Sequence, residues 1–306
     1  MQKANRKLLV FLMIFEFAVS PELFIEPNDI IFLEEAFSKD KGRLISDIPK
    51  RRWRQLVLQV INNSGEKPVM RKSMKQAANR LFRKALYTRQ TTPEINATDW
   101  LAVALAAHAD RPFRAIIVNE YDGDRNDVLI KDIKLIIHPL WQVPISESVD
   151  RNTATMLGVI QSVLACAGEV VLVDRNFRPE QQRFQNVLIG IMESLVTRSH
   201  GPHIGKVVYH VGDDIANDHL ETQCKACFGT RMPVGMTLEI VVHPRDELHD
   251  RFVLTDIGGV SFGQGLDESL GSGPDKVLIS RLSDSTYKEW WRKCKSTTVT
   301  FSIVTM

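Results

Sequence analysis

Residues 248–267 (LHDRFVLTDIGGVSFGQGLD) contain the side chains whose types and spacing best suit chemistry on a phosphate. His249 and Arg251 lie two positions apart, and Asp256 follows after four more residues. On an extended segment, residues two apart project from the same face. The imidazole would then lie beside a guanidinium fork that suits a phosphate. We expect an anion-binding site here, and the simpler alternative is a structural hydrogen-bond network that joins His249 and Arg251 to Asp250 or Asp256.

Glycines follow these residues as Gly258-Gly259 and as a second pair, Gly263 and Gly265. Without a Cβ, a glycine lets backbone N–H groups approach an anion closely. Gly263 and Gly265 are therefore candidate substrate-binding positions.

The spacing HxRx4D resembles the HxKx4D motif of the phospholipase D superfamily, with Arg251 in place of the lysine. The longer string, HDR at 249–251 and GQGLD at 263–267, is similar to the C-terminal phospholipase-D-like domain of MIT-domain-containing abscission proteins. The resemblance extends from about residue 168 to the end of the chain. It implies an α/β domain with helices around a central sheet.

In catalytic members of that superfamily two such histidines meet in one pocket, without a metal or other cofactor. The resemblance implies that His249 is the nucleophile or acid, Arg251 the phosphate clamp and Asp256 an orienting or structural carboxylate. Arginine replaces lysine, however, and the chain has no convincing second copy of the motif. A homodimer would supply the second histidine, whereas the most similar branch binds membrane lipid without cleaving it.

Asp174-Arg175-Asn176 follows the apolar run at 169–173 (EVVLV). Ligands of α/β folds bind at strand ends, so Asp174 and Arg175 are further substrate-binding candidates. The alternative is a turn that leads into the next helix.

Residues 50–89 are strongly basic, with twelve Lys or Arg against one acid, Glu66, and thus a charge of +11 in a chain of net charge +2. Cations on one face of paired helices could neutralise a nucleic-acid backbone. They could also meet anionic lipid or form a solvated surface. The candidate nucleic-acid-binding residues are Arg51, Arg52, Arg54, Arg71, Lys72, Lys75, Arg83 and Lys84.

The apolar pattern divides the chain near residue 148. Helical spacing predicts helices at 28–44, 53–60, 71–87 and 99–108, so we expect residues 1–148 to form a mainly helical, basic region. Strands expected at 169–173, 206–210, 237–243 and 250–255 alternate with helices at 153–167 and 185–197. That alternation predicts an α/β domain over residues 149–306.

Cysteine usage and the N-terminus bear on the compartment. Four cysteines are too few for a disulfide framework, so we expect a reducing, cytoplasmic setting. Cys224 and Cys227 form a lone CxxC, which we interpret as two thiols in a loop rather than a metal site. The apolar run at 8–15 resembles a signal peptide but is interrupted by Glu16, so a buried first helix or strand is the preferred interpretation.

The leading hypothesis is a metal-independent phospholipase-D-like nuclease that acts on nucleic acid, in the setting of a microbial defence or mobile-element system with possible partner proteins. The alternative is a non-catalytic module that recognises phosphate on nucleic acid, anionic lipid or a partner protein. The substrate, the oligomeric state and the activity of a site with arginine for lysine are not fixed by the sequence.

Overall fold

The computed structural model describes residues 13–89, 99–199, 201–271 and 275–305. The chain forms two compact units. Residues 14–143 with 199–202 make the N-terminal unit, and residues 144–198 and 203–306 build the C-terminal unit. The division at 143/144 falls five residues before the domain boundary expected after residue 148.

The N-terminal unit is built on a parallel five-stranded sheet of order β3-β2-β1-β4-β5. Its strands are short and almost wholly buried, which is typical of a sheet covered on both faces. The strands are β1 (Phe15–Val19), β2 (Arg43–Ser46), β3 (Leu86–Tyr87), β4 (Ile116–Val118) and β5 (Val128–Ile130). The helices expected from the sequence thus surround a parallel sheet that the sequence analysis did not identify.

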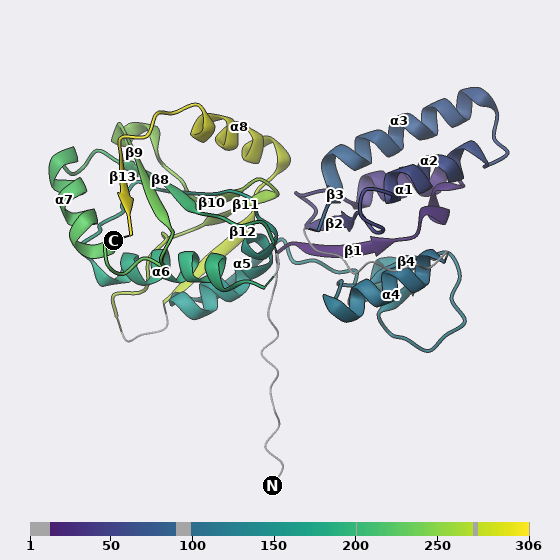
Figure 1. Cartoon of the computed structure of the whole chain (residues 1–306), viewed down its shortest axis with the longest axis horizontal. Helices are drawn as coiled ribbons and strands as arrows, with labels where there is room; N and C mark the ends of the chain where they lie inside the picture. The colour runs from purple at the N-terminus through teal and green to yellow at the C-terminus, as the bar shows by residue number, and fades with distance from the viewer. Residues whose placement is uncertain (1–12, 90–98, 200, 272–274, 306) are drawn as a thin grey trace, which may run out of the picture. The chain divides into compact units, whose positions relative to one another are not determined.

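Helices cover both faces of this sheet (Figure 1). The helices α1 to α3 lie on one face and α4 lies on the other, where its alanines pack against Ala18 and Ile116. Their bounds are α1 (Pro27–Ala36), α2 (Trp53–Asn62), α3 (Pro68–Ala85) and α4 (Trp100–Asp110). The helix expected at 28–44 ends at Ala36, and residues 43–46 form β2 instead. Residues 13–19, which include the end of the apolar N-terminal run and all of β1, are buried, whereas residues 1–12 lie outside the described part.

The C-terminal unit is an α/β domain around an eight-stranded mixed sheet of order β13-β9-β8-β7-β10-β11-β12-β6. The strands β7, β8 and β9 are parallel, and β10 runs antiparallel to β7. The strands are β6 (Ser146–Asp150), β7 (Val170–Asp174), β8 (Lys206–Gly212), β9 (Thr237–His243), β10 (Arg251–Thr255), β11 (Gly258–Phe262), β12 (Lys276–Arg281) and β13 (Phe301–Val304).

Both faces of this sheet are also covered by helices. The helices α5 (Thr153–Cys166) and α6 (Gln182–Thr197) lie on one face, and α8 (Asp284–Lys295) lies on the other (Figure 1). Alternate residues of β7 and β10, including Val171 and Phe252, form a buried cluster with Tyr287 and Cys294 of α8. The fourth helix, α7 (Asn217–Phe228), carries Cys224 and Cys227, so these thiols lie on a helix and not in a loop as expected. Burial raises the pKa of the Cys224 thiol to about 12.

Among the described residues, no helix combines the length and the hydropathy needed to cross a bilayer.

The N-terminal unit contains a buried cluster of charged residues centred on Glu16, and this cluster yields a first prediction. Glu16 of β1 accepts hydrogen bonds from Arg89 at 2.7 Å and from Arg111 at 3.1 Å, and Arg89 is only 1% exposed. Replacing Glu16 by alanine leaves these arginines without their counter-charge, which costs about 3–5 kcal/mol of unfolding free energy. Urea denaturation measures this loss.

Glu34→Ala provides the matched control, because it removes a carboxylate whose partner, Arg80, lies 52% exposed in solvent. Solvent screens such a pair, so this variant should unfold close to the wild-type midpoint. Equal midpoints for the two variants would contradict the structural importance of the Glu16 cluster.

Candidate functional site

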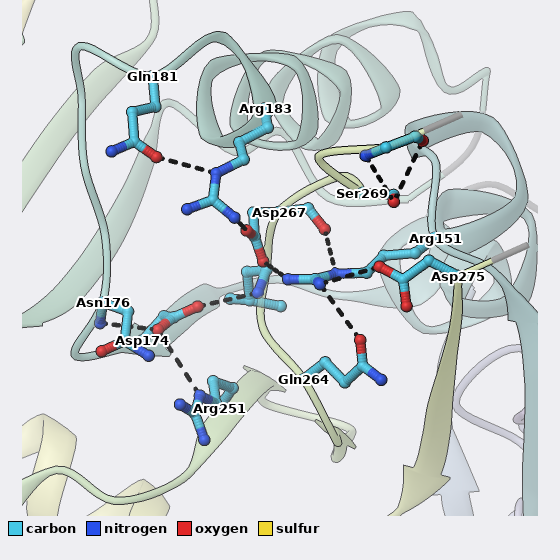
Figure 2. Close-up of polar contacts among 12 residues, drawn as sticks. Arg151, Asp174, Asn176, Gln181, Arg183, Arg251, Gln264, Asp267, Ser269 and Asp275 are labelled. Atoms are coloured by element: carbon cyan, nitrogen blue, oxygen red, sulfur yellow. Dashed lines mark hydrogen bonds and ion pairs between the residues drawn. The ribbon is translucent and has the colours of Figure 1, made fainter. Parts of the chain in front are cut away.

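Strand pairing brings two of the sequence candidates together at the carboxyl end of β7. Arg251, the first residue of β10, pairs in register with Asp174, the last residue of β7. The Asp174 carboxylate is fully buried, and its two oxygens accept hydrogen bonds at 2.9 Å from the backbone N–H groups of Asn176 and Leu266. The Arg251 Nε lies 3.9 Å from Asp174 Oδ1 (Figure 2). Burial raises the pKa of Asp174, although the two backbone donors and Arg251 act in the opposite direction.

A second buried carboxylate, Asp267, holds the loop of residues 263–267 in place. Asp267 is 2% exposed and pairs with both Arg151 and Arg183. Arg151 also donates to Gln264 and to Asp275, each at 3.2 Å (Figure 2). Because the loop in turn presents the Leu266 N–H to Asp174, the two carboxylates and three arginines form one connected network.

Gly265 lies where this loop turns, with φ at +153°, a conformation that residues with side chains rarely adopt. A Cβ at this position would lie 3.4 Å from an oxygen of Asp174 and would collide with an oxygen of Asp267. The packing of this loop against the carboxylate network therefore requires a glycine at position 265. Gly263 has no such constraint, since its Cβ would meet only Leu278 at 3.5 Å or beyond.

His249 and Arg175 face each other beside this network. The Arg175 Nη1 lies 3.3 Å from His249 Nδ1, and His249 is exposed. A guanidinium has donors only, so Nδ1 must be the acceptor and the neutral ring carries its proton on Nε2. His249 therefore offers an N–H donor outward from this contact.

Two arginines contact the His249 segment, and the Nε atom of each is covered by the protein. The Nε atoms of Arg175 and Arg251 make no hydrogen bond within the described residues, although Arg251 Nε lies 3.9 Å from Asp174 Oδ1. Any anion at this place would therefore meet the other guanidinium nitrogens. Arg251 Nη1 also donates to the His249 carbonyl at 3.3 Å, so the Arg251 side chain contacts the backbone of His249.

A shallow cavity of about 460 Å³ opens beside Arg175 and His249. Its lining also includes Asp213, Arg245 and Asp246. The backbone N–H of Arg245 donates to Asp213 at 2.9 Å, and its side chain pairs with Asp214 at 2.9 Å. The cavity therefore combines donors with nearby carboxylates, an environment that suits a singly charged anion better than a doubly charged one.

Two buried histidines, His210 and His243, lie in contact on neighbouring strands of the sheet. His243, at the carboxyl end of β9, and His210 of β8 are joined by a 2.7 Å contact between Nε2 and Nδ1. Burial, with the neighbouring His243 and Lys293, lowers the pKa of His210 to about 3. Burial is also the main cause that lowers the pKa of His243. Lys293 lowers this pKa further, whereas Glu247 raises it. Both rings are therefore neutral at physiological pH.

Asp256 does not join the candidate site. It follows β10 at the strand end opposite to Arg251, where its Oδ1 accepts hydrogen bonds from the N–H groups of Gly168 and Glu169 at 2.7 and 3.2 Å. Asp256 thus stabilises the turn before β7. This position gives no geometric support to a catalytic role for Asp256.

Most of the basic helical residues are accessible, as a nucleic-acid surface requires. Arg51, Arg52, Arg54, Lys72 and Arg83 are exposed, whereas Arg71, Lys75 and Lys84 are half-buried. Arg71 donates to the Asn62 carbonyl at 2.8 Å, and the Arg54 guanidinium lies 5.1 Å from the Phe82 ring centroid. Arg89, counted in the basic stretch, belongs to the buried Glu16 cluster.

The network depends on residues that the motif did not include. Arg151 and Arg183 reach Asp267 from positions 116 and 84 residues away in sequence. No local pattern marks either arginine. A partial signal was the acid at the end of the GQGLD string, since an aspartate beside apolar residues often needs a buried partner.

Comparisons with known proteins identify no family. No protein-family model matches the chain, and a search of curated proteins gives no match. A solved structure of TrmBL2, described as an archaeal chromatin protein with a novel mode of DNA binding, aligns with 53% of this chain and 58% of its own at 14% identity. The TM-score is 0.24, too low to establish a shared fold or function. The chain spans less than two thirds of that protein's length.

The conformation of Gly265 generates a prediction with an internal control. Gly265→Ala adds a Cβ at positive φ and against Asp267, so unfolding free energy should fall by about 1–3 kcal/mol. Gly263→Ala meets only ordinary contacts and should leave stability unchanged or slightly higher. Thermal or urea denaturation of the two variants measures the contrast. A Gly265 variant as stable as the Gly263 variant would show that the loop does not depend on this glycine.

The histidine pair predicts an acid-sensitive stability. An unfolded histidine takes up a proton near pH 6.5, whereas folded His210 resists protonation down to about pH 3. The stabilisation is therefore complete above about pH 6.5 and declines as pH falls toward 3, by at most about 1.4 kcal/mol per pH unit. His210→Gln keeps a polar partner for His243 but cannot titrate. Urea denaturation between pH 7.5 and 5 should show a shallower decline for this variant, and identical slopes would refute the assignment.

Proposed function

We propose that the C-terminal unit binds a phosphodiester at the carboxyl end of β7, through Arg175, Arg251 and the outward N–H of His249. The observation that carries the proposal is the convergence of two arginines on His249, since Arg175 Nη1 lies 3.3 Å from the ring Nδ1 and Arg251 Nη1 donates to the His249 carbonyl at 3.3 Å. Arginine forks suit phosphate oxygens, and the buried Asp174 and Asp267 hold the surrounding segments in position. A diester fits better than a monoester dianion because Asp246 also lines the cavity.

Nucleic acid is the proposed source of that phosphodiester. The N-terminal unit exposes cations on and beside α2 and α3, including Arg52, Lys72 and Arg83. Each cation that neutralises a phosphate releases counterions, so binding should weaken steeply with salt. The same site could also bind a phosphate group of an anionic lipid or of a partner protein, and these are the alternative ligands.

Recognition without cleavage is favoured over nuclease activity by the partner of His249. A nucleophilic imidazole needs a free ring nitrogen, with its other N–H held by an acceptor. Here the partner of Nδ1 is the donor Arg175, so the neutral ring keeps its proton on Nε2. The nuclease hypothesis remains a prediction that requires a different ring orientation. It also requires a homodimer in which a second His249 completes the pocket.

Binding of short labelled DNA and RNA oligonucleotides tests this proposal by fluorescence anisotropy in EDTA. Arg251→Ala removes one guanidinium of the site and should raise Kd roughly 10- to 100-fold, the equivalent of a charge-assisted hydrogen bond or two. His249→Ala should cause a smaller loss, because it removes one neutral donor. Arg292→Ala, an exposed cation on α8, is the control for non-specific charge.

The same reactions, followed by gel electrophoresis, separate recognition from catalysis. The proposal expects intact oligonucleotides with every variant. EDTA-resistant cleavage that disappears in His249→Ala would overturn it and establish the nuclease. Equal affinities for the Arg251 and Arg292 variants would contradict a phosphodiester site at Arg251.

A further inference from the structure

The N-terminal unit holds a separate cavity of about 1,020 Å³. It lies at the carboxyl edge of the parallel sheet, because its lining comes directly after β1, at Pro21 and Glu22, and directly after β4, at Asn119. In the order β3-β2-β1-β4-β5 the chain moves from β1 to one side and returns to β4 on the other. Sheets of this kind bind ligands in the crevice at that reversal point.

One wall of the cavity is apolar and rigid. Leu56 and Val60 of α2 and Val103 of α4 contribute aliphatic surface. Trp100, the first residue of α4, adds an indole whose Nε1 donates to the Ile48 carbonyl at 2.8 Å, so the ring is fixed in place. Such a wall suits a flat heteroaromatic ring.

Polar groups of both charges occupy the rest of the lining. Glu22 and Asn119 supply oxygen acceptors that suit the hydroxyl groups of a sugar, and Asp99, whose two oxygens also cap α4 through the N–H groups of Leu101 and Ala102, has further lone pairs for the same purpose. Arg52, exposed before α2, is the cation among the lining residues. The turn after β1 reads Ser20-Pro21-Glu22 and has no glycine, and Pro21 lacks an N–H. An anionic group would therefore be held by Arg52 rather than by backbone amides.

We propose that this cavity binds a purine nucleoside monophosphate. The base lies against Trp100 and the aliphatic wall, the ribose hydroxyls bond to Glu22 or Asp99, and the phosphate meets Arg52. Arg52 supplies the positive charge of the lining, so each phosphate beyond the first would add uncompensated negative charge beside Glu22 and Asp99. This site is independent of the phosphodiester site in the C-terminal unit.

Isothermal titration calorimetry of the full chain with AMP, GMP and adenosine tests the inference. We expect saturable binding of a purine mononucleotide. Arg52→Ala should weaken the affinity for the mononucleotide tenfold or more and leave that for adenosine nearly unchanged. Val60→Trp should place a bulky indole in the cavity and weaken binding of all three probes, with its fold checked by circular dichroism. Lys67→Ala is the control for charge, because Lys67 is an exposed cation of the same unit that lies outside the lining.

Three outcomes would overturn the inference. The first is that neither mononucleotide binds saturably. The second is that Arg52→Ala leaves the mononucleotide affinity unchanged. The third is that mononucleotide binding is lost in Arg251→Ala and retained in Arg52→Ala. The last outcome would place the ligand in the C-terminal unit. Because oligonucleotide binding there is measured with the Arg251 variant, failure of one proposal leaves the other intact.

Discussion

The fully buried carboxylate of Asp174 connects the parts of the C-terminal unit on which the phosphodiester site depends. Its oxygens accept the N–H groups of Asn176 and Leu266, so the turn after β7 and the loop of residues 263–267 are both fixed to the same point. A buried carboxylate without such donors would be costly, and the donors are therefore obligatory. The loop can supply its donor only because Asp267 is held by Arg151 and Arg183 and because Gly265 permits the turn.

This arrangement explains how a site forms from segments that are distant in sequence. Antiparallel pairing starts β10 where β7 ends, which brings Arg251 beside Asp174 and leaves His249 in front of Arg175. Parallel strands of the N-terminal unit achieve a similar result by another route, because successive carboxyl ends meet at one edge of the sheet. In both units the strands supply rigidity, and the residues just beyond them supply the polar groups.

Sequence reasoning located the α/β domain because its apolar runs are long enough to be distinct, as at Thr237–His243. It did not identify the N-terminal sheet, although it expected the helices that cover it, because most of the strands are short and resemble other features. Phe15–Val19 adjoins an apolar run like that of a signal peptide, and Arg43–Ser46 continues a helical pattern. The HxR pair was found from local spacing, whereas Arg151, Arg183 and the His210–His243 pair depend on tertiary contacts that no local pattern records. Asp256 shows the converse. It has the spacing of the motif, yet it follows β10 at the end opposite to Arg251 and therefore lies outside the candidate site.

The protonation of His249 is the most direct test of the account. Long-range ¹H–¹⁵N correlation spectra of the histidine rings, recorded during titration with dimethyl phosphate, report which nitrogen carries the proton. The account predicts that Nδ1 of His249 accepts from Arg175 while Nε2 carries the hydrogen, and that His249 shows diester-dependent shifts that His210 and His243 do not share. A ring with its proton on Nδ1 and a free Nε2, or one that does not respond to the diester, would contradict it.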